Sequence, residues 1–250
     1  MSAAMLSVRG LIKRFGGLVA TDRVDIEVNA GEIHALIGPN GAGKTTLLSQ
    51  LIGELPQDQG EIRLDGEEIG RLPTPERVRR GLGRTFQITQ LLPDYTVADN
   101  VALAVQARQG HSFRFFRDAR ADAGLRAEAR RVLAAGGLAD RAEVPVADLS
   151  HGERKQLELD VALATGPRLL LLDEPMAGLG PAESQQMIER LASLKGRIAM
   201  LLVEHDMEAV FTLADRVSVL VYGRVIASGT VAQIRDDPEV RSAYLGDGSA

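Results

Sequence analysis

Apolar and polar positions along the first ninety residues follow the patterns of strands joined by turns. Apolar and acidic residues alternate over 24–28, which predicts a half-buried strand. A glycine-containing turn at 29–31 leads into 33–37, an apolar run that ends at Gly38 and predicts a buried strand. Apolar positions at helical spacing over 45–52, followed by Gly53, predict a helix that begins near Lys44. We therefore expect strands and turns around a single helix in this part of the chain.

The character of the chain changes between about residue 91 and residue 165. Alanine, arginine and leucine dominate this stretch, and strand patterns disappear. Helices are predicted at 97–106 and 126–135, the second one stopped by Gly136 and Gly137. Between them lies the basic aromatic stretch 113–117, which fits either contact with a membrane partner or a hydrophobic anchor beneath a surface loop. We interpret the whole stretch as a helical insertion.

Strand and helix patterns alternate again after residue 165. The pattern predicts, in order, a buried strand at 168–173, a helix from Pro181, a strand at 198–203, a short helix from Met207, and a hairpin of 216–221 and 224–227. Strands that alternate with helices indicate a largely parallel sheet covered on both faces. The chain is thus predicted to have an α/β core of residues 1–90 and 166–250 and a helical subdomain of residues 91–165.

Composition and charge narrow the class of protein. The hydrophobic fraction of 45% and the charged fraction of 25% are those of an ordinary globular protein. The net charge of -5 argues against nonspecific binding of nucleic acid, and the absence of cysteine excludes disulfides and thiolate metal sites. The first residues lack the apolar core of a secretory signal, and no run of about 18 apolar residues predicts a membrane span. A membrane role would therefore require a partner.

One segment matches the phosphate-binding loop pattern G-x-x-x-x-G-K-[ST]. Glycines let such a loop curl and aim its N–H groups at phosphate oxygens, and the following helix adds its positive end. Lys44 would bridge the β- and γ-phosphates, and the Thr45 hydroxyl would ligate Mg²⁺. A glycine-rich turn without function is the alternative, but the predicted strand before and helix after favour the phosphate loop. The candidate nucleotide-binding residues here are Gly38, Pro39, Asn40, Gly41, Ala42, Gly43, Lys44, Thr45 and Thr46.

A second segment places two acids directly after four leucines. Residues 169–172 predict a buried strand that delivers Asp173 and Glu174 at its carboxyl end, where ligands bind in an open α/β sheet. Asp173 can hold the shell of Mg²⁺, and Glu174 can orient or polarise the attacking water. An acidic strand end alone fits a solvated terminus equally well. Beside the phosphate loop it indicates a P-loop nucleotidase that uses ATP and Mg²⁺.

The stretch 149–156 then resembles the L-S-x-G signature of ABC ATPases. Ser150 and the backbone of Gly152 can cap a phosphate at a helix N-terminus, as the first loop does. An ordinary serine N-cap has the same sequence pattern, but its place just upstream of Asp173 favours the signature. This resemblance implies a P-loop NTPase (RecA-like) α/β core with a mostly parallel sheet, an antiparallel β subdomain and an inserted α-helical subdomain.

Other positions match the same family in order along the chain. The resemblance implies that Phe15 stacks on adenine, and that Gln87 joins the core to the helical subdomain and senses Mg²⁺ and the γ-phosphate. It also implies that His205 is the switch histidine that contacts the γ-phosphate, and that Glu174, His205, Lys44 and Gln87 form the catalytic set. His34, His111 and His151 receive no catalytic role. Gly180 stands where the family usually has aspartate or asparagine, so the coupling role of loop 177–181 is left open.

The family resemblance also implies an assembly. Two ATPase subunits, identical or different, would meet head to tail, and Ser150 and Gly152 of one would cover ATP held by Lys44 of the other. The partners would be transmembrane permease subunits and, indirectly, a substrate-binding protein, but no nucleic acid. The subunit would lie peripherally at the cytoplasmic face of the cell membrane.

The branch of the family is suggested by 83–87, the long insertion, loop 177–181 and the ending 244–246, which look like the branched-chain amino-acid importer group. The expected function is ATP hydrolysis that drives uptake of branched-chain amino acids or related small polar solutes. Importers of urea or amides, a non-transport ABC ATPase acting on nucleic acid, and an unrelated P-loop kinase or GTPase are the alternatives. The sequence leaves open the cargo and whether the dimer contains one kind of subunit or two.

Overall fold

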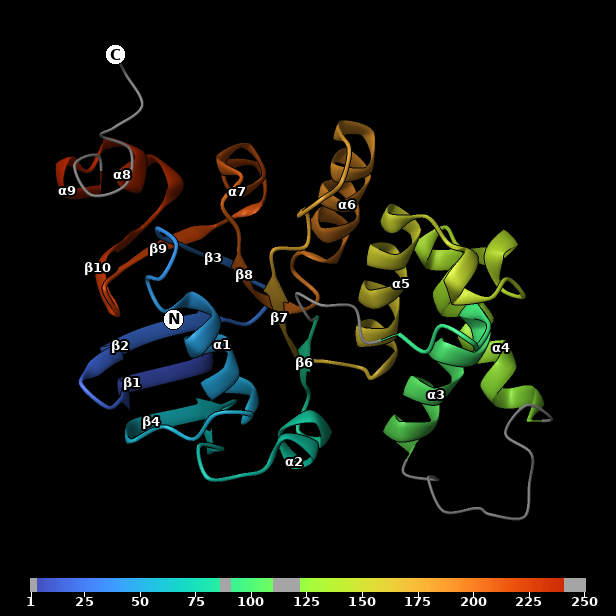
Figure 1. Cartoon of the computed structure of the whole chain (residues 1–250), viewed down its shortest axis with the longest axis horizontal. Helices are drawn as coiled ribbons and strands as arrows, with labels where there is room; N and C mark the ends of the chain where they lie inside the picture. The colour runs from blue at the N-terminus through green and yellow to red at the C-terminus, as the bar shows by residue number, and fades with distance from the viewer. Residues whose placement is uncertain (1–3, 86–90, 110–121, 241–250) are drawn as a thin grey trace.

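The computed structural model describes residues 4–85, 91–109 and 122–240, whose strands form two sheets (Figure 1). The first sheet has the order β2-β1-β4-β5 and consists of β1 (Ala4–Phe15), β2 (Leu18–Asn29), β4 (Gln59–Leu64) and β5 (Glu67–Glu68), all paired antiparallel. The second has the order β10-β9-β3-β8-β7-β6 and consists of β3 (Ile33–Ile37), β6 (Leu82–Arg84), β7 (Leu169–Asp173), β8 (Ala199–Val203), β9 (Arg216–Val221) and β10 (Arg224–Gly229). Only its β9–β10 pair is antiparallel within the described residues. The α/β class with a mostly parallel sheet is therefore confirmed.

The helices follow the predicted order, with differences at their ends. They are α1 (Lys44–Ile52), α2 (Thr74–Arg79), α3 (Val97–Gln109), α4 (Ala123–Gly136), α5 (His151–Ala164), α6 (Pro181–Leu194), α7 (Met207–Leu213), α8 (Val231–Asp236) and α9 (Pro238–Val240). The expectation of a single helix in the first ninety residues was wrong, because α2 is also there. Its six residues contain two apolar side chains, Pro75 and Val78, too few to show a helical period. The predicted helix 126–135 begins earlier because Asp122 caps α4 by accepting hydrogen bonds from the N–H groups of Gly124 and Leu125.

The central strands β3, β7 and β8 are buried along their whole length. In β7, Leu169 and Leu171 pack into a cluster that includes α1 and the antiparallel sheet. Leu170 and Leu172 point to the opposite face and pack against α6 and α7. Strands covered on both faces have little use for solvated polar positions, which explains why β7 and β8 are continuous apolar runs rather than alternating ones. The polar residue inside β3, His34, is buried and hydrogen-bonded to the Ser218 hydroxyl.

Helices α3, α4 and α5 form a group beside the larger sheet (Figure 1). Their shared apolar cluster contains residues between Val97 and Ala164. This lies inside the range 91–165 assigned to the helical subdomain from the sequence, although the boundaries of that subdomain and of the core 1–90 and 166–250 stay a prediction. The aromatic stretch 113–117 lies outside the described residues. Over the ranges that the structure covers, no helix has both the length and the apolar character needed to cross a bilayer.

A buried carboxylate connects α5 with α6. Asp160 is fully buried, and its Oδ1 lies 3.4 Å from Nη2 of Arg190. Its Oδ2 has no hydrogen-bond partner among the described residues, and Gly136 packs so closely that a Cβ there would lie 1.8 Å from this oxygen. Burial raises the pKa of Asp160 to about 7, against the opposing charge of Arg190.

We predict that Asp160 makes the protein less stable as pH rises. Because its pKa of about 7 lies above the value of about 3.9 in an unfolded chain, the native state alone keeps the proton between these two values. The free energy of unfolding should therefore fall from about pH 4 to about pH 7, by at most ~4 kcal/mol from this group, and level off above. In Asp160→Asn the difference between urea unfolding at pH 5 and at pH 8 should shrink.

The exposed Asp140 offers a matched control. Asp140→Asn should keep the pH dependence of the wild type. An unchanged pH dependence in Asp160→Asn would contradict the assignment.

Candidate nucleotide-binding site

The phosphate loop connects the end of β3 to the start of α1, as the sequence predicts. Close packing requires glycine at two of its positions: a Cβ at Gly38 would lie 2.1 Å from the carbonyl oxygen of Leu220, and one at Gly43 would lie 2.2 Å from that of Ala20. Gly43 also has a φ of 106° and gives α1 no side-chain cap. The N–H groups of the first turn of α1 are therefore available for an anion, which is the arrangement that a phosphate needs.

Lys44 bends back over this loop. Its Nζ donates hydrogen bonds to the carbonyl oxygens of Gly38 (2.7 Å) and Pro39 (3.1 Å). Burial lowers the pKa of Lys44, and the charges of Glu174 and Asp173 oppose that shift. The ammonium group thus lies on the phosphate loop and close enough to Asp173 and Glu174 for their charges to act on it. Thr45 is exposed and Thr46 half-buried on the first turn of α1.

Asp173, the last residue of β7, is a buried carboxylate, and among the described residues only one of its two oxygens has a hydrogen-bond partner. Its Oδ2 accepts a hydrogen bond from Nη2 of Arg84 (3.2 Å), a residue at the end of β6 that also pairs with Glu54. Its Oδ1 is buried without a hydrogen-bond partner in the described part of the chain. Burial raises the pKa of Asp173, and Arg84 opposes the shift. An orphaned carboxylate oxygen of this kind fits the hydration shell of Mg²⁺, which prefers oxygen ligands.

Glu174 has an unusual backbone. Its φ of 50° is in the left-handed region, which costs roughly 1–3 kcal/mol for residues other than glycine and often marks functional sites. Its N–H donates to the carbonyl oxygen of Val203 at the end of β8 (2.9 Å). This bond joins the end of β7 to the end of β8. Oε1 of Glu174 then lies 3.9 Å from Nδ1 of His205, so the structure brings these two predicted residues together.

The signature turn is formed at the start of α5. Ser150 is the N-cap: its Oγ accepts from the N–H of Glu153 (3.2 Å), whose Oε2 accepts from the N–H of Ser150 (2.8 Å). Ser150 is thus an ordinary N-cap within its own chain, and its role toward a nucleotide stays a prediction. Gly152 lies directly against α6: a Cβ there would lie 2.2 Å from Oε1 of Glu183, so that side chain would have to move to admit it.

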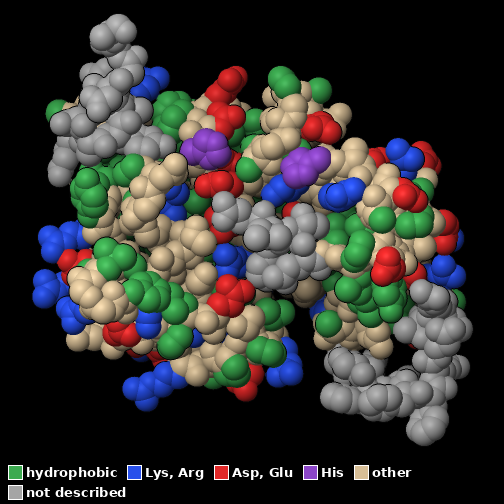
Figure 2. All heavy atoms as spheres, in the orientation of Figure 1, with side chains coloured by type: hydrophobic (Ala, Val, Ile, Leu, Met, Phe, Trp, Pro, Cys, Tyr) green, Lys and Arg blue, Asp and Glu red, His purple; other side chains and the backbone are tan. Residues whose placement is uncertain are grey.

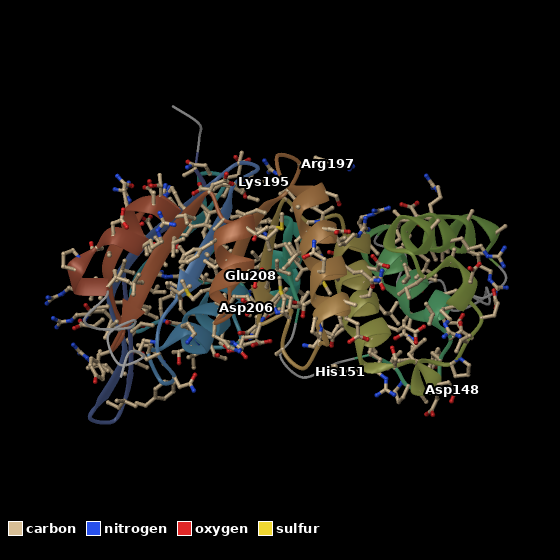
Figure 3. The ribbon with its side chains drawn as sticks, turned by 90° about the horizontal axis from the view of Figure 1, so that it is seen from above. Asp148, His151, Lys195, Arg197, Asp206 and Glu208 are labelled. Carbon is tan, nitrogen blue, oxygen red and sulfur yellow. The ribbon has the colours of Figure 1, made fainter. Side chains whose placement is uncertain are left out.

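These groups gather at the carboxyl ends of the parallel strands. In Figure 3, Asp206, which follows β8, and His151, the first residue of α5, lie on one side of the molecule, while Lys195 and Arg197, which precede β8, lie on the opposite side. Figure 2 shows histidine and acidic side chains close together on the face of the molecule that these strand ends approach.

Phe15, the predicted adenine contact, ends β1 with half of its side chain exposed, and Nζ of Lys13 lies 5.7 Å from its ring centre.

Two residues of the site, Arg84 and Glu204, were not predicted from the sequence. One predicted residue, Gln87, lies outside the described residues, so its position stays a prediction. For Arg84 the pattern holds no signal, because its pairing with Asp173 arises only when β6 and β7 align. Glu204 does carry a signal, since it follows a buried apolar strand just as Asp173 does.

Known proteins resemble this chain over its full length. A family model described as ABC transporter matches residues 21–177, and one described as branched-chain amino acid ATP-binding cassette transporter matches residues 224–250. The high-affinity branched-chain amino acid transport ATP-binding protein BraF of Pseudomonas aeruginosa is 38% identical over 256 residues, which cover 99% of this chain and 100% of BraF. Its counterpart LivG of Escherichia coli K12 is 39% identical over 259 residues, with coverage of 99% and 100%.

The fold has equally extensive matches. The crystal structure of the ADP conformation of MJ1267, an ATP-binding cassette of an ABC transporter, superposes with a TM-score of 0.86 at 29% identity, and covers 98% of this chain and 99% of its own. Together with the phosphate loop at β3 and the paired acids after β7, these matches define the protein's class. The chain belongs to the ABC transporter family, as one of its nucleotide-binding, ATP-hydrolysing subunits.

Proposed function

We propose that this subunit powers an importer of branched-chain amino acids or related small polar solutes. The observation that carries the hydrolytic part is the grouping of Lys44, Asp173 and Glu174 at one edge of the sheet, where the charges of both acids act on the buried Lys44 ammonium. The full-length similarity to BraF and LivG, both named for branched-chain amino acid transport, supports the cargo. The subunit would act peripherally at the cytoplasmic face of the membrane, through permease subunits and, indirectly, a substrate-binding protein.

Binding of ATP would use the phosphate loop and its flanks. The N–H groups of residues 40–46 and the Lys44 ammonium would hold the β- and γ-phosphates, which lets Lys44 exchange the carbonyl oxygens of Gly38 and Pro39 for phosphate oxygens. The half-exposed ring of Phe15 would stack on adenine. Thr45, Asp173 and Gln87 would hold Mg²⁺, which neutralises charge on the phosphates when it is bound.

Hydrolysis would rely on Glu174 and His205. Glu174 would accept a hydrogen bond from the attacking water and orient its oxygen toward the γ-phosphorus, so that the bond to the β-phosphate oxygen breaks as the new bond forms. His205, with Nδ1 3.9 Å from Oε1 of Glu174, would restrain that side chain and contact the γ-phosphate. The left-handed backbone at Glu174 supports this role, because it fixes the direction in which the carboxylate leaves the strand.

Closure of a dimer would complete the site. Ser150 and Gly152 of a second ATPase subunit, identical or different, would cover the γ-phosphate held by Lys44. The bound nucleotide favours closure only to the extent that it binds the closed form more tightly than the open form. Hydrolysis removes that difference and lets the subunits separate, which supplies the motion for the permeases.

We predict that Glu174→Gln binds ATP normally but hydrolyses it at least ~100-fold more slowly, because the amide cannot polarise water as a carboxylate does. ATP should therefore trap a dimer that size-exclusion chromatography detects. Glu189→Gln, on the exposed side of α6, should hydrolyse ATP at the wild-type rate. Normal turnover in Glu174→Gln would refute its catalytic role.

We predict that Asp173→Asn loses the dependence of nucleotide affinity on Mg²⁺. Its Oδ1 is the orphaned oxygen that fits the metal's hydration shell, and an amide oxygen attracts the cation far less. Titration with a fluorescent ATP analogue, with Mg²⁺ and with EDTA, measures the effect separately from hydrolysis. If Mg²⁺ tightens binding equally in the wild type and in the variant, Asp173 is not part of the metal site.

The importer function is tested in proteoliposomes that contain this subunit together with its permease subunits and substrate-binding protein. We expect ATP-dependent uptake of radiolabelled leucine or isoleucine and ATPase activity that rises with loaded binding protein. Uptake of urea or short amides instead would move the subunit to that importer group. Stimulation by DNA or ribosomes without the permeases would refute a transport role altogether.

A further inference from the structure

Glu204, the residue directly after β8, is a fully buried carboxylate. Buried charges are costly unless hydrogen bonds satisfy their oxygens. Here the donors are backbone N–H groups: Oε1 accepts from Met176 (2.9 Å), and Oε2 accepts from His205 (3.0 Å) and, at a longer 3.4 Å, from Asp206. One carboxylate thus bonds two separate segments of backbone.

The two segments are those that carry the proposed hydrolytic residues. Met176 lies two residues after Glu174, in the connection from β7 to α6, whereas His205 and Asp206 lie in the connection from β8 to α7. The bond from the Glu174 N–H to the carbonyl oxygen of Val203, the last residue of β8, joins the same two strand ends. The two oxygens of Glu204 therefore restrain, relative to each other, the two connections that carry Glu174 and His205.

The two connections together use both carboxylate oxygens of Glu204 as hydrogen-bond acceptors. Nδ1 of His205 lies 3.8 Å from Oε2 of Glu204 and 3.9 Å from Oε1 of Glu174, so the imidazole sits between the two carboxylates. The His205 side chain itself is largely exposed, and the carboxylate beneath it is what restrains the backbone from which it projects. If the Glu204 side chain offered one acceptor only, one of the two connections would lose its restraint.

We infer that Glu204 is a positioning residue, which holds the loop of Glu174 and the loop of His205 in register for hydrolysis without touching ATP. This inference rests on the proposed roles of Glu174 and His205. It adds that the rate of the hydrolytic step depends on a carboxylate one residue before the histidine, through the backbone donors of Met176 and His205.

The test is Glu204→Gln, which keeps the shape of the side chain but leaves a single acceptor oxygen and places an NH₂ group against a backbone N–H donor. We expect kcat to fall about 10- to 100-fold, as for the loss of a hydrogen bond to a charged group. KM for ATP and the Kd of a fluorescent ATP analogue should stay within about 2-fold, because no contact with the nucleotide is removed. A kcat within about 2-fold of the wild type would overturn the inference.

A double variant separates positioning from general damage to the fold. If Glu204 acts through His205, Glu204→Gln should lower kcat much less in a His205→Ala background than in the wild type. Fully additive losses would overturn the inference. Glu208→Gln, an exposed glutamate on α7 (Figure 3), is the matched control and should keep the wild-type kcat.

Two further measurements keep the outcomes distinct. Should Glu204→Gln fail to fold, hydrogen exchange in the wild type takes its place: the amides of Met176 and His205 should exchange far more slowly than an exposed loop amide, and rapid exchange would overturn the inference. Glu174→Gln and His205→Ala test the proposed function itself. If both keep full ATPase activity, that function fails; if both lose it while Glu204→Gln keeps it, only the inference about Glu204 fails.

Discussion

Burial of β3, β7 and β8 on both faces is the constraint on which the site depends. Apart from His34 in β3, whose ring is hydrogen-bonded to Glu27 and Ser218, and Asp173 at the end of β7, the side chains of these strands are apolar, and their burial stabilises the centre of the sheet. Their parallel direction brings their carboxyl ends to one edge. The phosphate loop after β3, Asp173 at the end of β7 and Glu204 after β8 are therefore neighbours, although they are far apart in the sequence.

The same burial sets the electrostatics of this edge. It lowers the pKa of Lys44 and raises that of Asp173, because in each case it disfavours the charged form. Neighbouring opposite charges counter both shifts: the two acids act on Lys44, and Arg84 acts on Asp173. Among the residues that the structure describes, backbone oxygens satisfy Lys44, one guanidinium pairs with Asp173, and Oδ1 of Asp173 has no hydrogen-bond partner. A site of this kind is stabilised by a ligand that brings both negative charge and a cation, as a nucleotide with Mg²⁺ does.

The sequence predicts what depends on local pattern. The leucine run before Asp173, the glycines of the phosphate loop and the stop of α4 at Gly136 and Gly137 each follow from a short stretch of chain. What depends on contact between distant segments could not be predicted: the pairing of Arg84 with Asp173 requires the β6–β7 register, and the fit of Gly136 against Asp160 requires the packing of α4 on α5. Glu204 belongs to both classes, because its position at a strand end was visible and its bond to Met176 was not.

The local contacts of the signature turn also bear on Gly180, which replaces the acid or amide usual in the family. Nε2 of His151 lies 3.3 Å from the carbonyl oxygen of Ala177, and a Cβ at Gly178 would lie 2.9 Å from that nitrogen. Glu183 packs on Gly152 and, through Oε2, accepts from the N–H of Gly180 (3.0 Å). Loop 177–180 is therefore held by α5 and by the first turn of α6 within its own chain. Because these restraints act through the backbone and through Glu183, a glycine at position 180 leaves the loop's conformation supported while removing a polar side chain from its outer surface.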